Sequence, residues 1–203
     1  MLLPRGSASI RDFPIRRLAL RKIATIFSCL MLAGCWQSTG SLFNDVQPVQ
    51  PFRGGKVVSS NPGKPGEVSH AVLTKAKDGS YRLTSADKND AGDAVVLRFI
   101  ALPGLPQDVF VFEAVSDDKC RPGQTCHPMT AKSERDYGLV RRTREGAEVT
   151  NPDCNRSDPA ASLPGVKAGD YGICSFTSRA SLQSALLALA GQSWKTSVLY
   201  RYE

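Results

Sequence analysis

The residues with the most reactive side chains are six cysteines and two histidines in a chain of 203 residues. Two of the cysteines, Cys29 and Cys35, lie near the N-terminus. The other four are Cys120, Cys126, Cys154 and Cys174. Four cysteines in one domain either form disulfides, with three possible pairings, or bind a metal through their thiolates. The choice between these two depends on whether the chain is exported to an oxidising compartment.

The N-terminal segment has the layout of a secretory signal peptide. Basic residues precede an apolar run at 23–34, which ends in small residues. The run has 12 residues, whereas a helix that crosses a bilayer needs roughly 20. Because positive charge stays on the cytoplasmic side of the membrane, we expect the chain that follows to be exported.

The apolar run ends in Leu32-Ala33-Gly34-Cys35, which resembles the lipobox of bacterial lipoproteins. The resemblance implies cleavage between Gly34 and Cys35, and a lipid on Cys35 that anchors the chain to the membrane. The alternative is an ordinary signal peptide in which the cysteine is incidental. Trp36, where some lipoproteins have Asp, implies the outer membrane facing the periplasm, rather than the inner membrane or the cell surface.

Most of the positive charge belongs to the segment that we expect to be removed. Residues 1–34 hold six basic residues and one acidic residue, so a net charge of +7 falls to +2. We therefore expect no nucleic-acid partner. The expected organisation is a signal peptide at 1–34, a lipidated cysteine and flexible tether rich in Pro, Gly and Ser at 35–67, and one disulfide-stapled β-rich domain at 68–203.

The segment 68–203 alternates between strand-like runs and turns. Asp78-Gly79 between two such runs predicts a hairpin. Leu182, Ala185, Leu186 and Leu189 recur at helical spacing, with Thr177 or Ser178 as the N-cap and Gly191 as the end. We expect an α+β, mainly β fold: an antiparallel sheet or partly closed barrel of about six to eight strands with one helix near the C-terminus. The expected strands are 69–76, 80–85, 94–102, 109–115, 137–143, 147–150, 171–176 and 196–202.

In an exported domain the four remaining cysteines favour disulfides, and we expect the pairs Cys120–Cys126 and Cys154–Cys174. The second pair would contribute about 3 kcal/mol by closing a loop. The alternative is a metal site formed by Cys120, Cys126, His127 and Cys154. Five residues separate the first two cysteines, which is wider than the usual spacing of zinc ligands and too wide for haem attachment. We therefore expect no metal and no cofactor.

Several short patterns suggest binding or catalysis but are incomplete. A Ser-x-x-Lys match at 85–88 and a partial calcium loop from Asp87 lack their companion residues. His70 and Ser69 are neighbours on an expected strand and so face opposite ways. Arg141, Arg142 and Arg144 near Tyr137 could bind an anion, although a solvated strand face is the simpler interpretation.

No set of residues forms a coherent catalytic group, so we expect a protein that is not an enzyme. The hypothesis is a lipid-anchored envelope protein, a binding or structural module whose partner is an envelope protein or peptidoglycan. Lysozyme-inhibitor lipoproteins are similar in architecture, which implies a cell-wall hydrolase as one target. The alternative is an envelope hydrolase acting on peptidoglycan or a glycan, with carboxylates from Glu113, Asp117 or Asp118.

Overall fold

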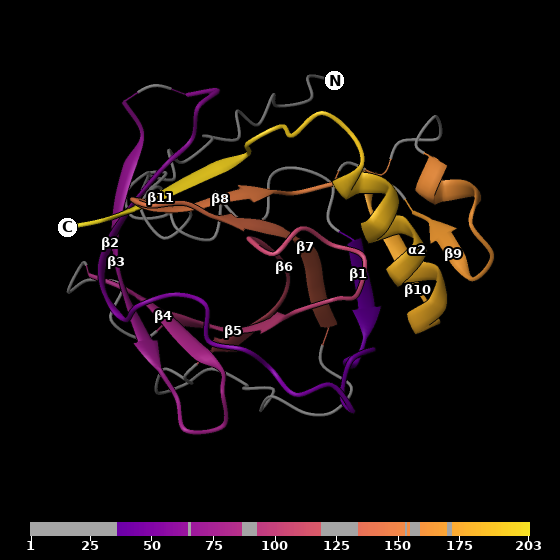
Figure 1. Cartoon of the computed structure of the whole chain (residues 1–203), viewed down its shortest axis with the longest axis horizontal. Coiled ribbons are helices and arrows are strands. Elements are labelled where there is room, and N and C mark those ends of the chain that lie inside the picture. The colour runs from indigo at the N-terminus through magenta and orange to yellow at the C-terminus, as the bar shows by residue number, and fades with distance from the viewer. Residues whose placement is uncertain are drawn as a thin grey trace, which may run out of the picture.

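The computed structural model describes residues 36–64, 66–86, 93–118, 134–152, 154, 159–169 and 172–203. Eight of its strands form a closed barrel (Figure 1). Each strand pairs antiparallel with the next along the chain, and the last pairs with the first. These strands are β2 (Gly55–Ser60), β3 (Val68–Lys75), β4 (Tyr81–Ser85), β5 (Asp93–Ile100), β6 (Val109–Asp118), β7 (Glu134–Arg142), β8 (Gly146–Thr150) and β11 (Val198–Tyr202).

The expected fold class is confirmed: the structure is mainly β and antiparallel, with one α-helix near the C-terminus in the described part of the chain. The helix is α2 (Arg179–Ala190), and the side chain of its N-cap Ser178 accepts a hydrogen bond from the backbone N–H of Ser181. Gly191 follows its last residue, as the sequence predicts. The barrel is fully closed because Leu199 to Tyr202 pair with Ser60 to Val57.

The segment expected to be a flexible tether is instead part of the folded domain. It contains β1 (Trp36–Thr39) and β2, the first strand of the barrel. Trp36 and Phe43 are 1% and 0% exposed. The Pro- and Gly-rich composition of this segment predicts a linker, but four widely spaced apolar side chains in it are buried: Trp36, Phe43, Phe52 and Val57. The folded domain therefore includes the described chain from Trp36 onward, and the expected boundary at residue 68 is corrected.

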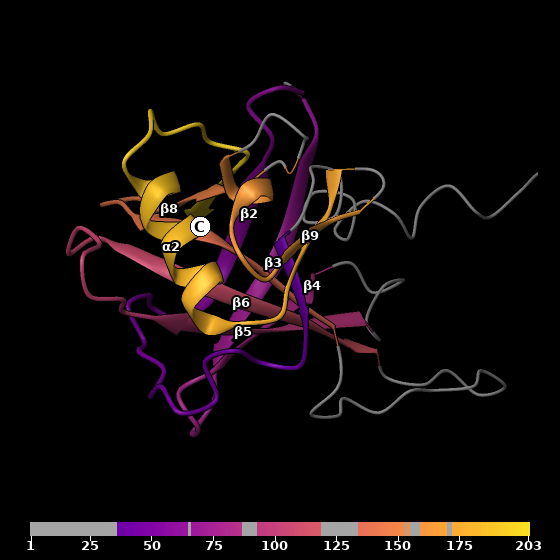
Figure 2. The ribbon, with the colours of Figure 1, turned by 90° about the vertical axis from the view of Figure 1, so that its right-hand side faces the viewer.

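A second apolar cluster lies outside the barrel, between the wall of β6 and β7 and the elements that cover it. Leu182, Ala185 and Leu186 of α2 are buried there, which is the stripe that the helical spacing predicts. Figure 2 shows α2 in front of the barrel strands. The other covering elements are β1, η2 (Pro159–Ser162), β9 (Val166–Ala168) and β10 (Cys174–Phe176).

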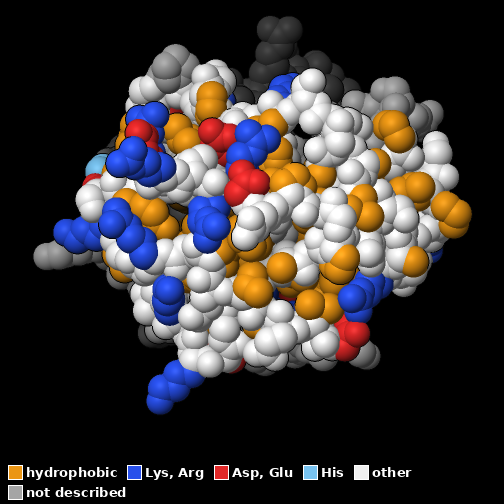
Figure 3. Space-filling model, viewed as in Figure 1, with side chains coloured by type: hydrophobic (Ala, Val, Ile, Leu, Met, Phe, Trp, Pro, Cys, Tyr) orange, Lys and Arg blue, Asp and Glu red, His pale blue; other side chains and the backbone are white. Residues whose placement is uncertain are grey.

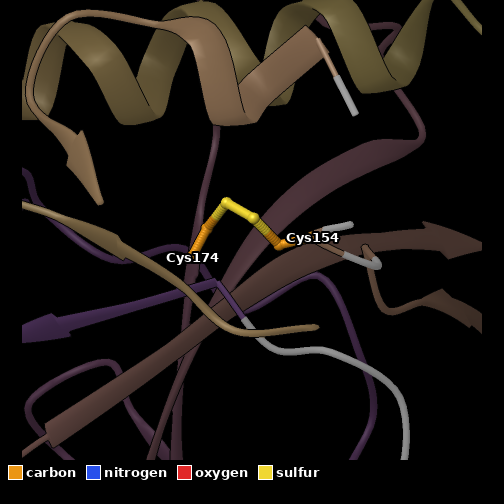
Figure 4. Close-up of a disulfide and its surroundings, with 2 residues drawn as sticks. All are labelled: Cys154 and Cys174. Atoms are coloured by element: carbon orange, nitrogen blue, oxygen red, sulfur yellow. A yellow bond between two sulfur atoms is a disulfide. The ribbon is translucent and has the colours of Figure 1, made fainter. Parts of the chain in front are cut away.

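Cys154 and Cys174 form a disulfide within this outer layer (Figure 4). Their Cα atoms are 5.4 Å apart, within the range that a disulfide requires, and both residues are buried. This pair is the one expected from the sequence. It also removes Cys154 from the alternative metal site. Cys120, Cys126 and His127 lie outside the described residues.

Candidate functional site

The interior of the barrel contains a cavity with apolar walls. Side chains alternate along each strand, and the inward set forms a buried cluster that is separate from the outer one. The cavity has a volume of about 60 Å³. Its walls include Val57, Leu73, Leu83, Leu97, Val140 and Val149. Residues from all eight barrel strands contribute, so the cavity exists only once the barrel has closed.

Phe52 lies across one end of the barrel and forms part of the cavity wall. Its ring centroid is 4.8 Å from that of Phe99 and 6.5 Å from that of Tyr81. The Tyr81 hydroxyl donates to the Phe52 carbonyl oxygen at 2.7 Å and accepts from its backbone N–H at 3.0 Å. Burial raises the pKa of the Tyr81 hydroxyl, which keeps it protonated and able to donate. Phe52 is thus held in place by its backbone as well as its ring.

Among the side chains that line the described cavity, only those of Tyr200 and Tyr202 carry a polar group. Tyr202 accepts a hydrogen bond at its hydroxyl from the backbone N–H of Arg53 at 3.1 Å. Burial raises the pKa of Tyr202 above its ordinary value. No Asp, Glu, Lys, Arg or His lies among the residues that line the described cavity. The site, as far as the described residues line it, can therefore bind an apolar group.

Glu113, a carboxylate considered for catalysis, lies on the outer face of the barrel wall and is 1% exposed. Its Oε1 is 3.0 Å from Nη1 of Arg98, and its Oε2 accepts from the hydroxyls of Tyr137 at 3.1 Å and Ser41. Burial and the Glu113 charge raise the pKa of Tyr137 to about 12. The Arg98 guanidinium thus neutralises the Glu113 carboxylate, and the hydrogen bond from Ser41 holds the chain around this residue against the barrel wall.

The structure does not bring the other nominated residues together as a site. His70 Nδ1 is 2.7 Å from Glu203 Oε1 on the surface, and both side chains are partly exposed. The Arg141 guanidinium stacks on the Trp194 ring at 4.1 Å and lies 3.6 Å from Glu148. Tyr137 instead contacts Glu113, so the structure does not group Tyr137 with the arginines.

Several nominated residues cannot be placed. Asp87 and Lys88 lie outside the described residues, as does Cys35, and the side chains of Asp117 and Asp118 are likewise outside them. In the part of the chain that is described, no group of three or more His, Cys, Asp or Glu side chains is arranged to hold a metal. No helix in that part is long and apolar enough to cross a membrane.

The fold and the site define a closed, eight-stranded up-and-down barrel with an apolar lumen. The chain matches no protein-family model. Comparison with curated proteins and with solved structures also finds no match.

Proposed function

We propose that this chain is a lipid-anchored protein of the cell envelope whose barrel binds a small apolar group in its lumen, without catalysis. The cavity supports the proposal. Barrels of eight strands are just wide enough to be filled by side chains or to hold one small ligand. About 60 Å³ inside this barrel is left unfilled, and its walls are almost entirely apolar. An apolar group in this space would make the packing contacts that the cavity walls lack, and it would leave no polar atom without a hydrogen-bond partner.

The size of the cavity limits the ligand. One water needs roughly 10–15 Å³, so a cavity of about 60 Å³ holds about four to six atoms of that size. Each methylene buried contributes about 0.8 kcal/mol, or about fourfold in the dissociation constant. The lumen therefore suits a short alkyl group or the tip of a longer chain.

The proposed anchor rests on the Leu-Ala-Gly-Cys motif that ends at Cys35. Because Trp36 is buried in the domain and consecutive Cα atoms are only about 3.8 Å apart, a lipid on Cys35 would hold the barrel directly against the membrane. We place the protein at the outer membrane, facing the periplasm. The alternative of an envelope hydrolase gains no support from Glu113, whose carboxylate is withdrawn from solvent and already paired with Arg98.

A series of n-alkanols from ethanol to decanol tests the lumen as a binding site. The probe protein is the chain from position 35 with Cys35→Ser, so that it carries no lipid. Titration followed by NMR should show the dissociation constant falling about fourfold per methylene up to about six carbons and then levelling off. Absence of binding, or an affinity that rises without limit as for a surface patch, contradicts the proposal.

Two variants locate the binding within the barrel. Val149→Ala enlarges the lumen and should move the optimum to longer alcohols. Ala147→Leu fills the lumen and should weaken binding of hexanol. Val72→Ala is the matched control, since position 72 alternates with the inward Ala71 and Leu73 and faces out of the barrel.

The anchor is tested separately in cells. Metabolic labelling with palmitate should mark the unaltered chain and leave Cys35→Ser unlabelled, and the variant should leave the membrane fraction. Labelling of both forms, or of neither, contradicts lipidation at Cys35.

A further inference from the structure

Three cationic side chains surround the end of the barrel that Phe52 closes. They are Arg53, Lys75 and Arg142, and all three are exposed. Lys75 ends β3 and Arg142 ends β7. The strand register places both of these strand ends at the same end of the barrel as Tyr202, the last residue of β11. Figure 3 shows Lys and Arg side chains gathered among hydrophobic ones on the face where Figure 1 places β2, β3, β8 and β11.

Each of these cations lies over an aromatic ring of the lumen. The guanidinium carbon of Arg53 is 4.1 Å from the ring centroid of Tyr202, which lines the cavity. Arg142 lies 5.9 Å from the Phe110 ring, and Lys75 Nζ lies 6.0 Å from the Tyr81 ring. Lys75 and Arg142 also lie on the inward-facing side of their strands, since Lys75 is two positions after Leu73 and Arg142 is two positions after Val140.

Three of the neighbouring carboxylates have partners of their own. Glu145 pairs with Arg201, and Glu203 pairs with His70. Asp78 accepts hydrogen bonds from the backbone and hydroxyl of Ser80. Among the described residues no ion pair joins Arg53, Lys75 or Arg142 to a carboxylate. Positive charge at this end of the lumen is therefore available to a ligand.

We infer that the lumen takes an anionic amphiphile, with an apolar tail of about four to six carbons inside the barrel and an anionic head group at Arg53, Arg142 and Lys75. This inference rests on the proposed function and adds the charge of the ligand to it. A tail in the lumen places the head at the Phe52 end, where guanidinium groups can donate paired hydrogen bonds to a carboxylate or phosphate oxygen. Phe52 would shift aside to admit the tail, since its ring closes that end.

The test compares three probes with equal tails: hexanoate, hexan-1-ol and hexylammonium. Titration of the unlipidated chain, Cys35→Ser, should give hexanoate a dissociation constant about tenfold lower than that of hexanol, with hexylammonium weakest. The preference for hexanoate should shrink as salt is raised, because exposed charges are screened. Acetate should not bind measurably, since it lacks the tail.

Arg53→Gln and Arg142→Gln should each reduce the preference for hexanoate over hexanol while leaving hexanol binding unchanged. Lys56→Gln is the matched control, because Lys56 lies at the same end but directly precedes the inward Val57 on β2 and so faces outward. It should keep the preference. Hexanol and hexanoate binding with equal affinity overturns the inference but leaves the proposed function intact. Binding of neither overturns both.

Discussion

The carboxylate of Glu113 on β6 is paired with the guanidinium of Arg98 on β5 at 3.0 Å, directly across two neighbouring strands. Arg98 also donates from Nη2 to the carbonyl oxygens of Phe43 and Val46, at 3.3 and 3.0 Å. The pair therefore joins the barrel wall to the chain that runs from β1 towards Phe52. It explains how a segment with few local structural signals becomes ordered.

Arg98→Met should lower the free energy of unfolding by about 3 kcal/mol. The substitution leaves a buried carboxylate without its partner, which costs far more than the pair itself contributes. Urea denaturation followed by circular dichroism measures the change. Arg98→Met combined with Glu113→Leu is the control and should recover at least half of the loss, because no unpaired charge remains. A double variant as unstable as the sum of the single ones would contradict this interpretation.

Loss of the disulfide should also destabilise the domain. Cys154 and Cys174 are separated by 20 positions, and a loop of that size contributes about 3 kcal/mol through the entropy of the unfolded chain. Cys154→Ala with Cys174→Ala should lower the urea midpoint, and a reductant should then cause little further change. Cys120→Ala with Cys126→Ala provides the comparison, in which the reductant should still destabilise. Equal stability of the Cys154/Cys174 variant and the unaltered chain would refute the prediction.

Stability should fall at alkaline pH because of Tyr137. Its pKa is raised from 10.0 to about 12, so the folded state retains a proton that the unfolded state loses. The contribution is complete below pH 10 and decreases as pH rises from 10 to 12, by about 3 kcal/mol in total. Absorbance of the phenolate at rising pH should show a late-titrating step that Tyr137→Phe removes. A titration of the native chain that is complete near pH 10.5 would rule out the shift.

Gly146 should tolerate no side chain. A Cβ at this position would clash with the backbone carbonyl of Tyr200 on the neighbouring strand β11. Gly146→Ala should therefore cost about 2 kcal/mol or more, because two paired strands must move apart. At Gly169, by comparison, the nearest atom to an added Cβ is 3.5 Å away. Gly169→Ala should change the melting temperature little, and an equal effect of the two substitutions would contradict the close approach.

The sequence predicted the elements with strong local signals. Asp78-Gly79 joins β3 to β4, and the stripe from Leu182 to Leu186 packs as expected. It placed β1 and β2 within a flexible tether, because short strands among Pro and Gly residues have no sustained periodicity. It also left open whether the barrel closes, because closure depends on pairing between Val57 and Tyr202. No pattern local to either residue specifies that contact.

The candidate site was missed for a related reason. Alternation along β6 places Phe110, Phe112 and Ala114 on one face, and all three are buried inside the barrel. Whether such a face packs tightly or surrounds a cavity depends on how side chains from all eight strands meet, and the pattern of a single strand does not contain that information. Glu113 was nominated as a catalytic carboxylate because the sequence does not show that it is paired. Its partner Arg98 is 15 positions away. Only the strand register brings the two together.

The central claim is that an apolar chain enters the lumen, and a crystal soaked with 6-bromohexan-1-ol tests it most directly. The neutral head group keeps this test independent of the charge preference. Anomalous scattering should place the bromine inside the barrel, among Leu83, Val140 and Val149. Bromine found only on the outer surface, with the lumen unchanged, would contradict the account.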